Sequence, residues 1–186
     1  MVAHTRITAG EWRGRVIDTP RGSTTRPTRS LIREALFNII GGAIEGARLI
    51  DLYAGAGTVG FEALSRGAAA VTFVDRDRGA IRSIAATAER FGCADRCVLV
   101  TAYVPGWARR ASAELAAADI CFIDAPYRDP DLDRVLQAVG ASPPGLVVCE
   151  HHRERRLAEH IGRLQLTRQV RHGLTSLSFL QPTAHD

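Results

Sequence analysis

The chain has 186 residues, of which 46% are hydrophobic and 24% are charged. This length and composition predict one globular domain with room for a modest extension, and they argue against a disordered chain. No apolar run approaches the ~20 residues that span a bilayer, and the first residues lack the apolar core of a secretion signal. We therefore expect a soluble, cytoplasmic protein.

The positive charge of the chain is concentrated at its N-terminus. All 24 basic residues are arginine. Residues 1–33 hold seven of them against two acids, a net of +5, whereas the whole chain carries +4, so residues 34–186 sum to −1. A basic arm beside a nearly neutral body predicts a polyanionic partner that is contacted through the arm. The alternative is a solubilising tail.

The arm has the pattern of ordered structure. Residues 6–10 and 15–19 are two short β-like runs that could form a hairpin, with Trp12 at its tip among arginines. Residues 21–28 form a polar link. The apolar periodicity of residues 28–40 then predicts a helix, with Thr28 as its N-cap and a glycine pair after its end.

From residue 48 onward, strand and helix patterns alternate. Strands are predicted at 48–53, 70–75, 97–101, 120–124 and 146–150, and helices at roughly 58–67, 77–92, 105–118, 130–140 and 153–162. Several strands are almost wholly apolar, as strands covered on both faces are. Residues 163–173 and 174–182 predict two more strands that join near Gly173 and add an antiparallel pair at one edge. We therefore expect an α/β, doubly wound, Rossmann-like sheet over residues 28–186, preceded by a basic hairpin and link at 1–27.

The four cysteines do not indicate a metal site. Cys93 and Cys97 are four residues apart, and no second Cys or His pair stands at zinc spacing. Cys121 and Cys149 lie inside apolar runs. We expect reduced, mostly buried thiols and no metal.

A glycine motif follows the first strand of the alternating region. In DLYAGAGTVG, Gly55, Gly57 and Gly60 form G-x-G-x-x-G between a strand and a helix. Alone, this pattern occurs in many cofactor-binding folds. Asp75 closes the next strand 20 residues after Gly55, where a carboxylate can hold ribose hydroxyls. The combination predicts a nucleotide-like ligand.

The position of Asp51 indicates which of two kinds of ligand the glycine loop binds. It stands at the end of the strand, directly before the glycine loop. A dinucleotide pyrophosphate would meet a like charge there, whereas the ammonium and sulfonium of S-adenosylmethionine would be attracted. The sequence therefore favours S-adenosylmethionine over a nicotinamide dinucleotide.

The fourth strand ends in FIDAPY, residues 122–127, at the edge of the sheet where ligands bind in such folds. This stretch suits methyl transfer to an exocyclic amine. The Asp124 carboxylate and the Ala125 carbonyl could hold the two amine hydrogens and aim the lone pair, because Pro126 biases residue 125 to an extended conformation. The ring of Tyr127 could stack on the base. The alternative is a strand end with a proline turn and Tyr127 in the core.

Taken together, these motifs resemble a known family. The Asp-Pro-Pro-Tyr signature of amino-group methyltransferases is here Asp-Ala-Pro-Tyr. With DLYAGAGTVGFEALSRGA, FVDRD, RPTRSLIREALFNII and HGLTSLSFL, the chain closely resembles bacterial RsmD-type enzymes from about residue 5 to 181. These enzymes methylate the N2 amine of one guanine in 16S ribosomal RNA of the small subunit. The resemblance implies a seven-stranded class I methyltransferase fold whose N-terminal hairpin serves RNA.

The resemblance also implies roles for residues. The catalytic stretch would be Asp124, Ala125, Pro126 and Tyr127. The cofactor would contact Asp51, Gly55, Gly57, Gly60, Asp75, Arg76 and Thr28. RNA would contact Arg6, Trp12, Arg13, Arg15, Arg26 and Arg29. Two departures from the family matter: Ala125 replaces a proline, and the acidic residue that often follows the third strand is missing from TAYVPGW, so adenine recognition would fall to the backbone of residues 101–103 or to apolar packing.

Two other functions stay open. One is a DNA adenine-N6 or cytosine-N4 methyltransferase, which uses the same Asp-x-Pro-aromatic logic but usually carries a sizeable target-recognition region. The other is a non-catalytic RNA-binding assembly factor. We expect a monomer acting on RNA within a partly or fully assembled small subunit, because so small an enzyme has little surface with which to read sequence.

Overall fold

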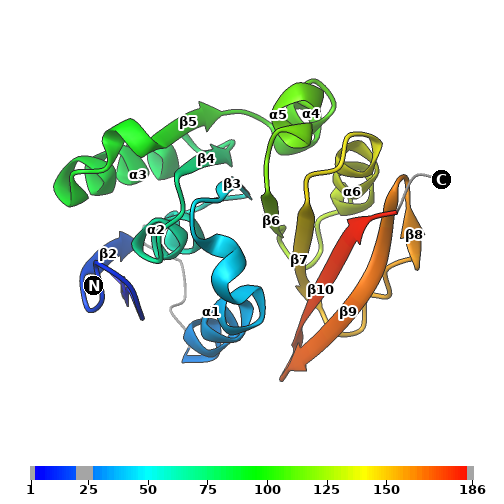
Figure 1. Cartoon of the computed structure of the whole chain (residues 1–186), viewed down its shortest axis with the longest axis horizontal. Helices are drawn as coiled ribbons and strands as arrows, with labels where there is room; N and C mark the ends of the chain where they lie inside the picture. Colours follow the sequence, from blue (N-terminus) through cyan, green and yellow to red (C-terminus); the bar gives the residue numbers. More distant parts are fainter. Residues whose placement is uncertain (1–2, 20–26, 184–186) are drawn as a thin grey trace.

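The protein was analysed as a computed structural model that describes residues 3–19 and 27–183, with side chains for residues 4–18 and 30–183. One large sheet runs through the molecule, and helices cover both of its faces (Figure 1). Its strands are β3 (Arg48–Leu52), β4 (Ala70–Asp75), β5 (Cys97–Thr101), β6 (Ile120–Asp124), β7 (Leu146–His152), β8 (His160–Ile161), β9 (Leu164–His172) and β10 (Thr175–Pro182).

The order of the strands is β5-β4-β3-β6-β7-β10-β9-β8. Strands β3 to β7 pair in parallel, and β10, β9 and β8 are antiparallel. The direction of winding reverses between β3 and β6, which makes the carboxyl ends of these two strands the place where a ligand is expected. This confirms the class I methyltransferase sheet, with the two-residue strand β8 added to the seven expected strands.

Helices α1 (Pro27–Ile40), α2 (Thr58–Ser65) and α3 (Arg78–Phe91) pack on one face of the sheet with the N-terminal hairpin. Helices α4 (Val104–Ala108), α5 (Ser112–Ala116) and α6 (Leu132–Ala141) lie on the other face (Figure 1). Two short 3-10 helices are also present: η1 (Gly41–Ile44) follows α1, and η2 (Ala94–Arg96) lies between α3 and β5. Each face has its own buried core, which explains why the central strands β3, β4, β6 and β7 are mostly apolar. In the described part of the chain, no helix is long and apolar enough to cross a membrane.

Several expected boundaries were wrong. The helix predicted at 153–162 is absent. A turn follows β7, where the Arg153 N–H donates to the Leu174 carbonyl at 2.8 Å, and His160 and Ile161 form β8, which pairs with β9. The helix predicted at 105–118 is divided into α4 and α5. Helix α1 begins at Pro27, so Thr28 lies in its first turn and is not its N-cap. Residues 20–26 of the link lie outside the described residues.

The N-terminal hairpin is formed by β1 (Ala3–Arg6) and β2 (Val16–Thr19). The two strands are separated by more residues of sequence than the runs predicted at 6–10 and 15–19. Between the strands, Ile7 and Trp12 are buried in the core that α2 joins, whereas Gly10, Glu11 and residues 13–15 are exposed. Gly10 marks the closest approach: its φ is +82°, and a Cβ there would lie 1.8 Å from the Ser65 carbonyl oxygen. The Glu11 N–H donates to this same carbonyl at 2.8 Å. The hairpin therefore shares the core of the main fold.

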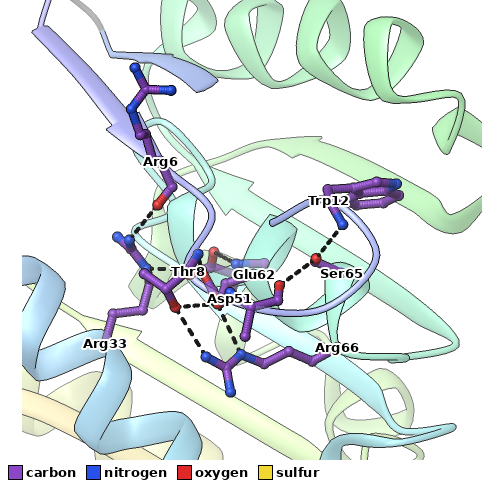
Figure 2. Close-up of polar contacts among 10 residues, drawn as sticks. Arg6, Thr8, Trp12, Arg33, Asp51, Glu62, Ser65 and Arg66 are labelled. Atoms are coloured by element: carbon purple, nitrogen blue, oxygen red, sulfur yellow. Dashed lines mark hydrogen bonds and ion pairs between the residues drawn. The ribbon is translucent and has the colours of Figure 1, made fainter. Parts of the chain in front are cut away.

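A buried carboxylate fastens the hairpin to the body (Figure 2). Glu62 of α2 is fully buried and accepts hydrogen bonds from the Thr8 N–H at 2.9 Å, the Thr8 hydroxyl at 2.6 Å and the Ala9 N–H at 3.1 Å. It also pairs with Arg33 of α1 at 3.3 Å and with Arg66 at 2.9 Å. Burial lowers the pKa of Arg33, although Glu62 opposes this effect. The Arg33 guanidinium also donates to the Arg6 carbonyl at 2.8 Å, which ties α1 to the hairpin.

Candidate active site

Four carboxylates stand at the carboxyl ends of neighbouring strands, on the face covered by α1 and α2. They are Asp51 in β3, Asp75 at the end of β4, Asp124 at the end of β6 and Glu150 in β7. Each lies two residues beyond a residue of the core on that face, and side chains two apart in a strand point the same way. These core residues are Leu49, Phe73, Phe122 and Val148. The sheet thus brings together acids that lie far apart in sequence.

The glycine loop follows β3 and starts α2. Gly55 and Gly57 have φ values of +55° and +71°, which favour glycine. A Cβ on Gly55 would meet only the Tyr53 carbonyl oxygen, at 3.9 Å, so the backbone is open there. Gly60 has a different role, which is to allow close packing: a Cβ on it would lie 2.2 Å from the Phe73 ring. Gly60 therefore lets α2 approach the sheet, and its contact with the cofactor stays a prediction.

Asp51 is buried beneath this loop, with 2% of its surface exposed. Its carboxylate accepts a hydrogen bond from the Gly60 N–H at 3.1 Å. Burial raises the pKa of Asp51 well above its usual range, and the carboxylates of Asp124 and Asp75 raise it further. A cation placed beside Asp51 would relieve this unfavourable burial of negative charge.

Asp75 supports the loop from the neighbouring strand. One of its oxygens accepts from the Gly55 N–H at 2.8 Å, and the other accepts from the Asp77 N–H at 2.9 Å. A carboxylate oxygen can accept more than one hydrogen bond, so each Asp75 oxygen can also accept a hydrogen bond from a ligand hydroxyl. Arg76, the next residue, is exposed.

The Asp124–Tyr127 stretch leaves β6 at the same edge. Asp124 is half-buried, Ala125 is buried, and Pro126 and Tyr127 are exposed. Tyr127 is 45% exposed and therefore does not lie in the core. Its hydroxyl bonds to the Thr175 hydroxyl, and its ring meets His152 edge-on at 5.5 Å. Thr175 of β10 and His152 of β7 thus hold the aromatic ring of Tyr127 near the end of β6, where Asp124 lies.

A narrow cleft of about 50 Å³ opens beside Asp124 and separates the sheet from α1. Its walls come from α1, the start of α2, β6 and β7. The lining residues are Ile32, Arg33, Leu36, Thr58, Val59, Phe122, Asp124 and Glu150. The cleft therefore lies between α1, the first residues of α2 and Asp124.

A larger hollow of about 870 Å³ lies on the other side of the carboxyl edge, beside Tyr103. Tyr103 follows β5 and bonds through its hydroxyl to Asp131 of the loop before α6. Asp131, from a distant segment, thus brings a carboxylate to the Tyr103 hydroxyl. The hollow is lined by Tyr103, Pro105, Gly106, Arg109, Asp133, Arg134, Gln137 and Ala138.

The predicted RNA-contacting residues separate into three groups. Arg6, Arg13 and Arg15 are exposed on the hairpin, and Arg15 stacks over the Phe91 ring at 4.0 Å. Trp12 is only 3% exposed and packs on Phe91 at 5.1 Å, so its ring is a core residue and cannot stack on RNA. Arg26 and the side chain of Arg29 lie outside the described residues, and so does the side chain of Thr28, which was predicted to contact the cofactor.

Sequence reasoning missed two residues of this site. Glu150 pairs in register with Asp124 on the adjacent parallel strand, and the charge that closes LVVCE beside the charge that closes ICFID is the signal that could have revealed it. Tyr53 has a φ of +62°, a strained conformation for a residue other than glycine. No sequence signal indicates that strain.

Known proteins resemble this chain over nearly its whole length. Residues 5–181 match the family described as Conserved hypothetical protein 95. The chain is 33% identical over 184 residues to the "Putative rRNA methyltransferase YlbH" of Bacillus subtilis, covering 93% of this chain and 96% of that protein. It is 32% identical over 131 residues to the "Ribosomal RNA small subunit methyltransferase D" of Escherichia coli, covering 70% of this chain and 64% of that protein.

A solved structure shows the same fold. The "Putative methyltransferase yhhF" of Escherichia coli superposes with a TM-score of 0.80 at 27% identity, covering 98% of this chain and 100% of the other. The family match and the similarity to YlbH extend from the N-terminal hairpin to β10. The chain therefore belongs to the Conserved hypothetical protein 95 family, together with the YlbH and methyltransferase D proteins.

Proposed function

We propose that this protein transfers a methyl group from S-adenosylmethionine to the exocyclic N2 amine of a guanine in 16S rRNA of the small ribosomal subunit. The observation that carries the proposal is the meeting of the Asp124–Tyr127 stretch and the glycine loop at one edge of the sheet. The chain's relatives named as rRNA methyltransferases support RNA as the substrate class.

The residues at the loop fit this cofactor. The open backbone at Gly55 offers a surface for it, and Asp75 offers acceptors for its ribose hydroxyls. The raised pKa of Asp51 favours a ligand with a cationic amine over one with phosphates. When bound, S-adenosylmethionine supplies an electrophilic methyl carbon and leaves as S-adenosylhomocysteine.

The protein's part in the chemistry is to position the amine. The Asp124 carboxylate accepts one N2 hydrogen and the Ala125 carbonyl accepts the other, which aims the nitrogen lone pair at the methyl carbon. The proton that N2 loses passes to Asp124 or to water. Tyr127, held by Thr175 and His152, stacks on the base. Such positioning and electrostatic stabilisation are the main sources of rate in a site of this kind.

The hairpin is the proposed RNA contact, through the exposed residues Arg6, Arg13 and Arg15. Phosphate contacts from arginine provide affinity but little sequence information. We therefore propose that an assembled or partly assembled subunit presents the target base. Such a base is already unstacked, or is cheap to unstack.

The test is methyl transfer from labelled S-adenosylmethionine to three acceptors: protein-free small-subunit RNA, small subunits lacking the modification, and duplex DNA. We expect N2-methylguanine in RNA or in subunits, which also identifies the preferred form of the substrate. N6-methyladenine or N4-methylcytosine in DNA would replace the proposal by a DNA methyltransferase. Cofactor binding without any product would indicate a non-catalytic assembly factor.

A further inference from the structure

Residues 153–174, which include β8 and β9, form a second basic region of the chain. They hold six arginines against two glutamates, a net of +4 with histidine neutral. The whole chain also carries +4, so the remaining residues, 1–152 and 175–186, sum to zero although they include the basic N-terminal arm. Two segments therefore carry the excess positive charge, and the proposed function gives a role only to the first.

The strand register places one face of β9 beside the active site. Thr175 of β10 stands opposite His152 of β7 and His172 of β9. Side chains that stand opposite each other in paired strands leave the sheet on the same face, and on that face Thr175 bonds to Tyr127. These side chains therefore continue the surface of Tyr127 outward from β6 to β9, across three strand spacings of about 4.8 Å each.

Arg168 lies further along the same face of β9. It stands four residues before His172 and opposite Phe179 of β10, whose side chain belongs to the core shared with α1. The Arg168 side chain is exposed, and so is that of Arg153, which directly follows β7. Among the described residues, neither side chain forms an ion pair or a hydrogen bond. Both positive charges are thus available to a partner.

An RNA strand fits this surface. The two hairpins lie on opposite sides of α1, with the N-terminal hairpin beside α2 and α3 and the β9–β10 hairpin at the other end of the sheet (Figure 1). A strand whose target base lies against Tyr127 continues away from the site on both sides of that base. The N-terminal hairpin can bind the strand on one side only, so the other side meets the exposed face of β9.

We propose that the face of β9 that carries Arg168 and His172, together with Arg153, is a second RNA-binding surface. It contacts phosphates of the strand beside the target nucleotide. This inference rests on the proposed function and adds to it a contact on the other side of the target base. Phosphate contacts fix the register and orientation of a nucleic acid without reading its sequence. The surface therefore sets how the strand crosses the site.

The test compares Arg168→Gln, Arg153→Gln and their combination with the control Arg163→Gln. Arg163 is an exposed arginine of the same segment, but it precedes β9 and lies five residues, about 17 Å of strand, from Arg168. Affinity, KM and kcat are measured with the RNA or subunit that the unaltered protein methylates, and affinity is measured over a series of salt concentrations. Cofactor affinity and thermal unfolding show that each variant is folded.

The double variant should bind its acceptor roughly tenfold more weakly, with a raised KM and with kcat close to that of the unaltered protein. The slope of log affinity against log salt concentration should fall by about 1.4–1.8, because each lost phosphate contact contributes about 0.7–0.9. Arg163→Gln should behave as the unaltered protein does. An equal loss in this control would indicate diffuse attraction and would overturn the inference, and so would a fall in kcat with unchanged affinity.

A crosslink distinguishes RNA from a ribosomal protein as the partner. With p-benzoylphenylalanine in place of His172, irradiation of the complex should attach the protein to RNA within a few nucleotides of the modified guanine. Attachment to a ribosomal protein, or no attachment near that guanine, would overturn the inference and leave the proposed function intact. Failure of the unaltered protein to methylate guanine in any RNA or subunit would instead refute the proposed function, and the inference with it.

Discussion

Glu62 and Asp124 are two carboxylates on the same face of the sheet, and the protein uses them in opposite ways. Glu62 is fully buried, and hydrogen bonds from the hairpin, α1 and the end of α2 converge on it. Asp124 is half-buried in the wall of a cleft. Arg33 connects the two regions, since it donates to Glu62 and lines the cleft. A fully buried carboxylate bonded to donors from three segments sets structure, whereas a half-buried one in the wall of a cleft stands where a ligand could reach it.

The largest effect is expected where the enclosed carboxylate is removed. Glu62→Ala leaves the Arg33 guanidinium buried without its ion-pair partner, and breaking a buried pair in this way costs about 3–5 kcal/mol. The free energy of unfolding, from chemical denaturation, should fall by this amount. Glu114→Ala on exposed α5 is the control. A loss below about 1 kcal/mol, the value of an exposed pair, would mean that Glu62 does not fasten the hairpin.

Asp124→Asn should have the opposite profile. The amide oxygen of asparagine can still accept a hydrogen bond, but it carries no negative charge and cannot take up the proton from N2, so the rate of methyl transfer should fall by about 100-fold or more. Stability and cofactor affinity should stay close to those of the unaltered protein, as in the exposed control Asp95→Asn. Full activity in the Asp124 variant would place the chemistry elsewhere.

Asp75→Ala tests the proposed cofactor site at the glycine loop. The change removes the proposed acceptors for the ribose, and it leaves the Gly55 and Asp77 N–H groups without the carboxylate to which they donate. Calorimetry should show cofactor binding weakened by about 1–3 kcal/mol. Unchanged affinity would remove Asp75 from the cofactor site.

Asp51 predicts a pH dependence. Burial raises the pKa of Asp51 in the free protein, so the carboxyl group keeps its proton at pH values above 3.8, its usual pKa. A cationic amine pairs only with the ionised form. Cofactor affinity should therefore rise with pH through the raised pKa, by at most about tenfold per pH unit for one proton. Asp51→Asn should bind more weakly and lose this dependence. The same slope in the variant would assign the proton to another group.

The smallest effect is expected on the exposed hairpin. Arg13→Glu should weaken RNA binding modestly. It should also reduce the slope of log affinity against log salt concentration by about one, because phosphate contacts act through counterion release. Folding and cofactor binding should not change. Arg110→Glu, an exposed arginine outside the hairpin, is the control. Equal losses in both variants would argue for a diffuse basic surface instead of a hairpin contact.

The contrast between Glu62 and Asp124 also separates what the sequence could predict from what it could not. The glycine turn, the strand ends at Asp75 and Asp124 and the apolar strands were predicted because each depends on neighbouring residues. Glu62, Trp12 and Glu150 depend on segments that meet only in the fold. Trp12, for example, is surrounded by arginines in sequence, yet it is buried against Phe91 of α3.

The false helix at 153–162 has the same origin. Its composition suits a helix, but a turn follows β7, residues 155–158 have no regular structure, and β8 pairs with β9 at His160 and Ile161. Pairing between strands overrides local preference at the end of this segment. The position of Glu150 beside Asp124 likewise follows from the strand order, which apolar patterns alone do not fix.

The most direct test of the account is made in cells from which this gene has been removed. Nucleoside analysis of their small-subunit RNA should show the loss of one N2-methylguanine, restored by the unaltered gene and not by the Asp124→Asn variant at equal protein level. An N2-methylguanine content that is the same with and without the gene, or that the Asp124→Asn variant restores in full, would contradict the account.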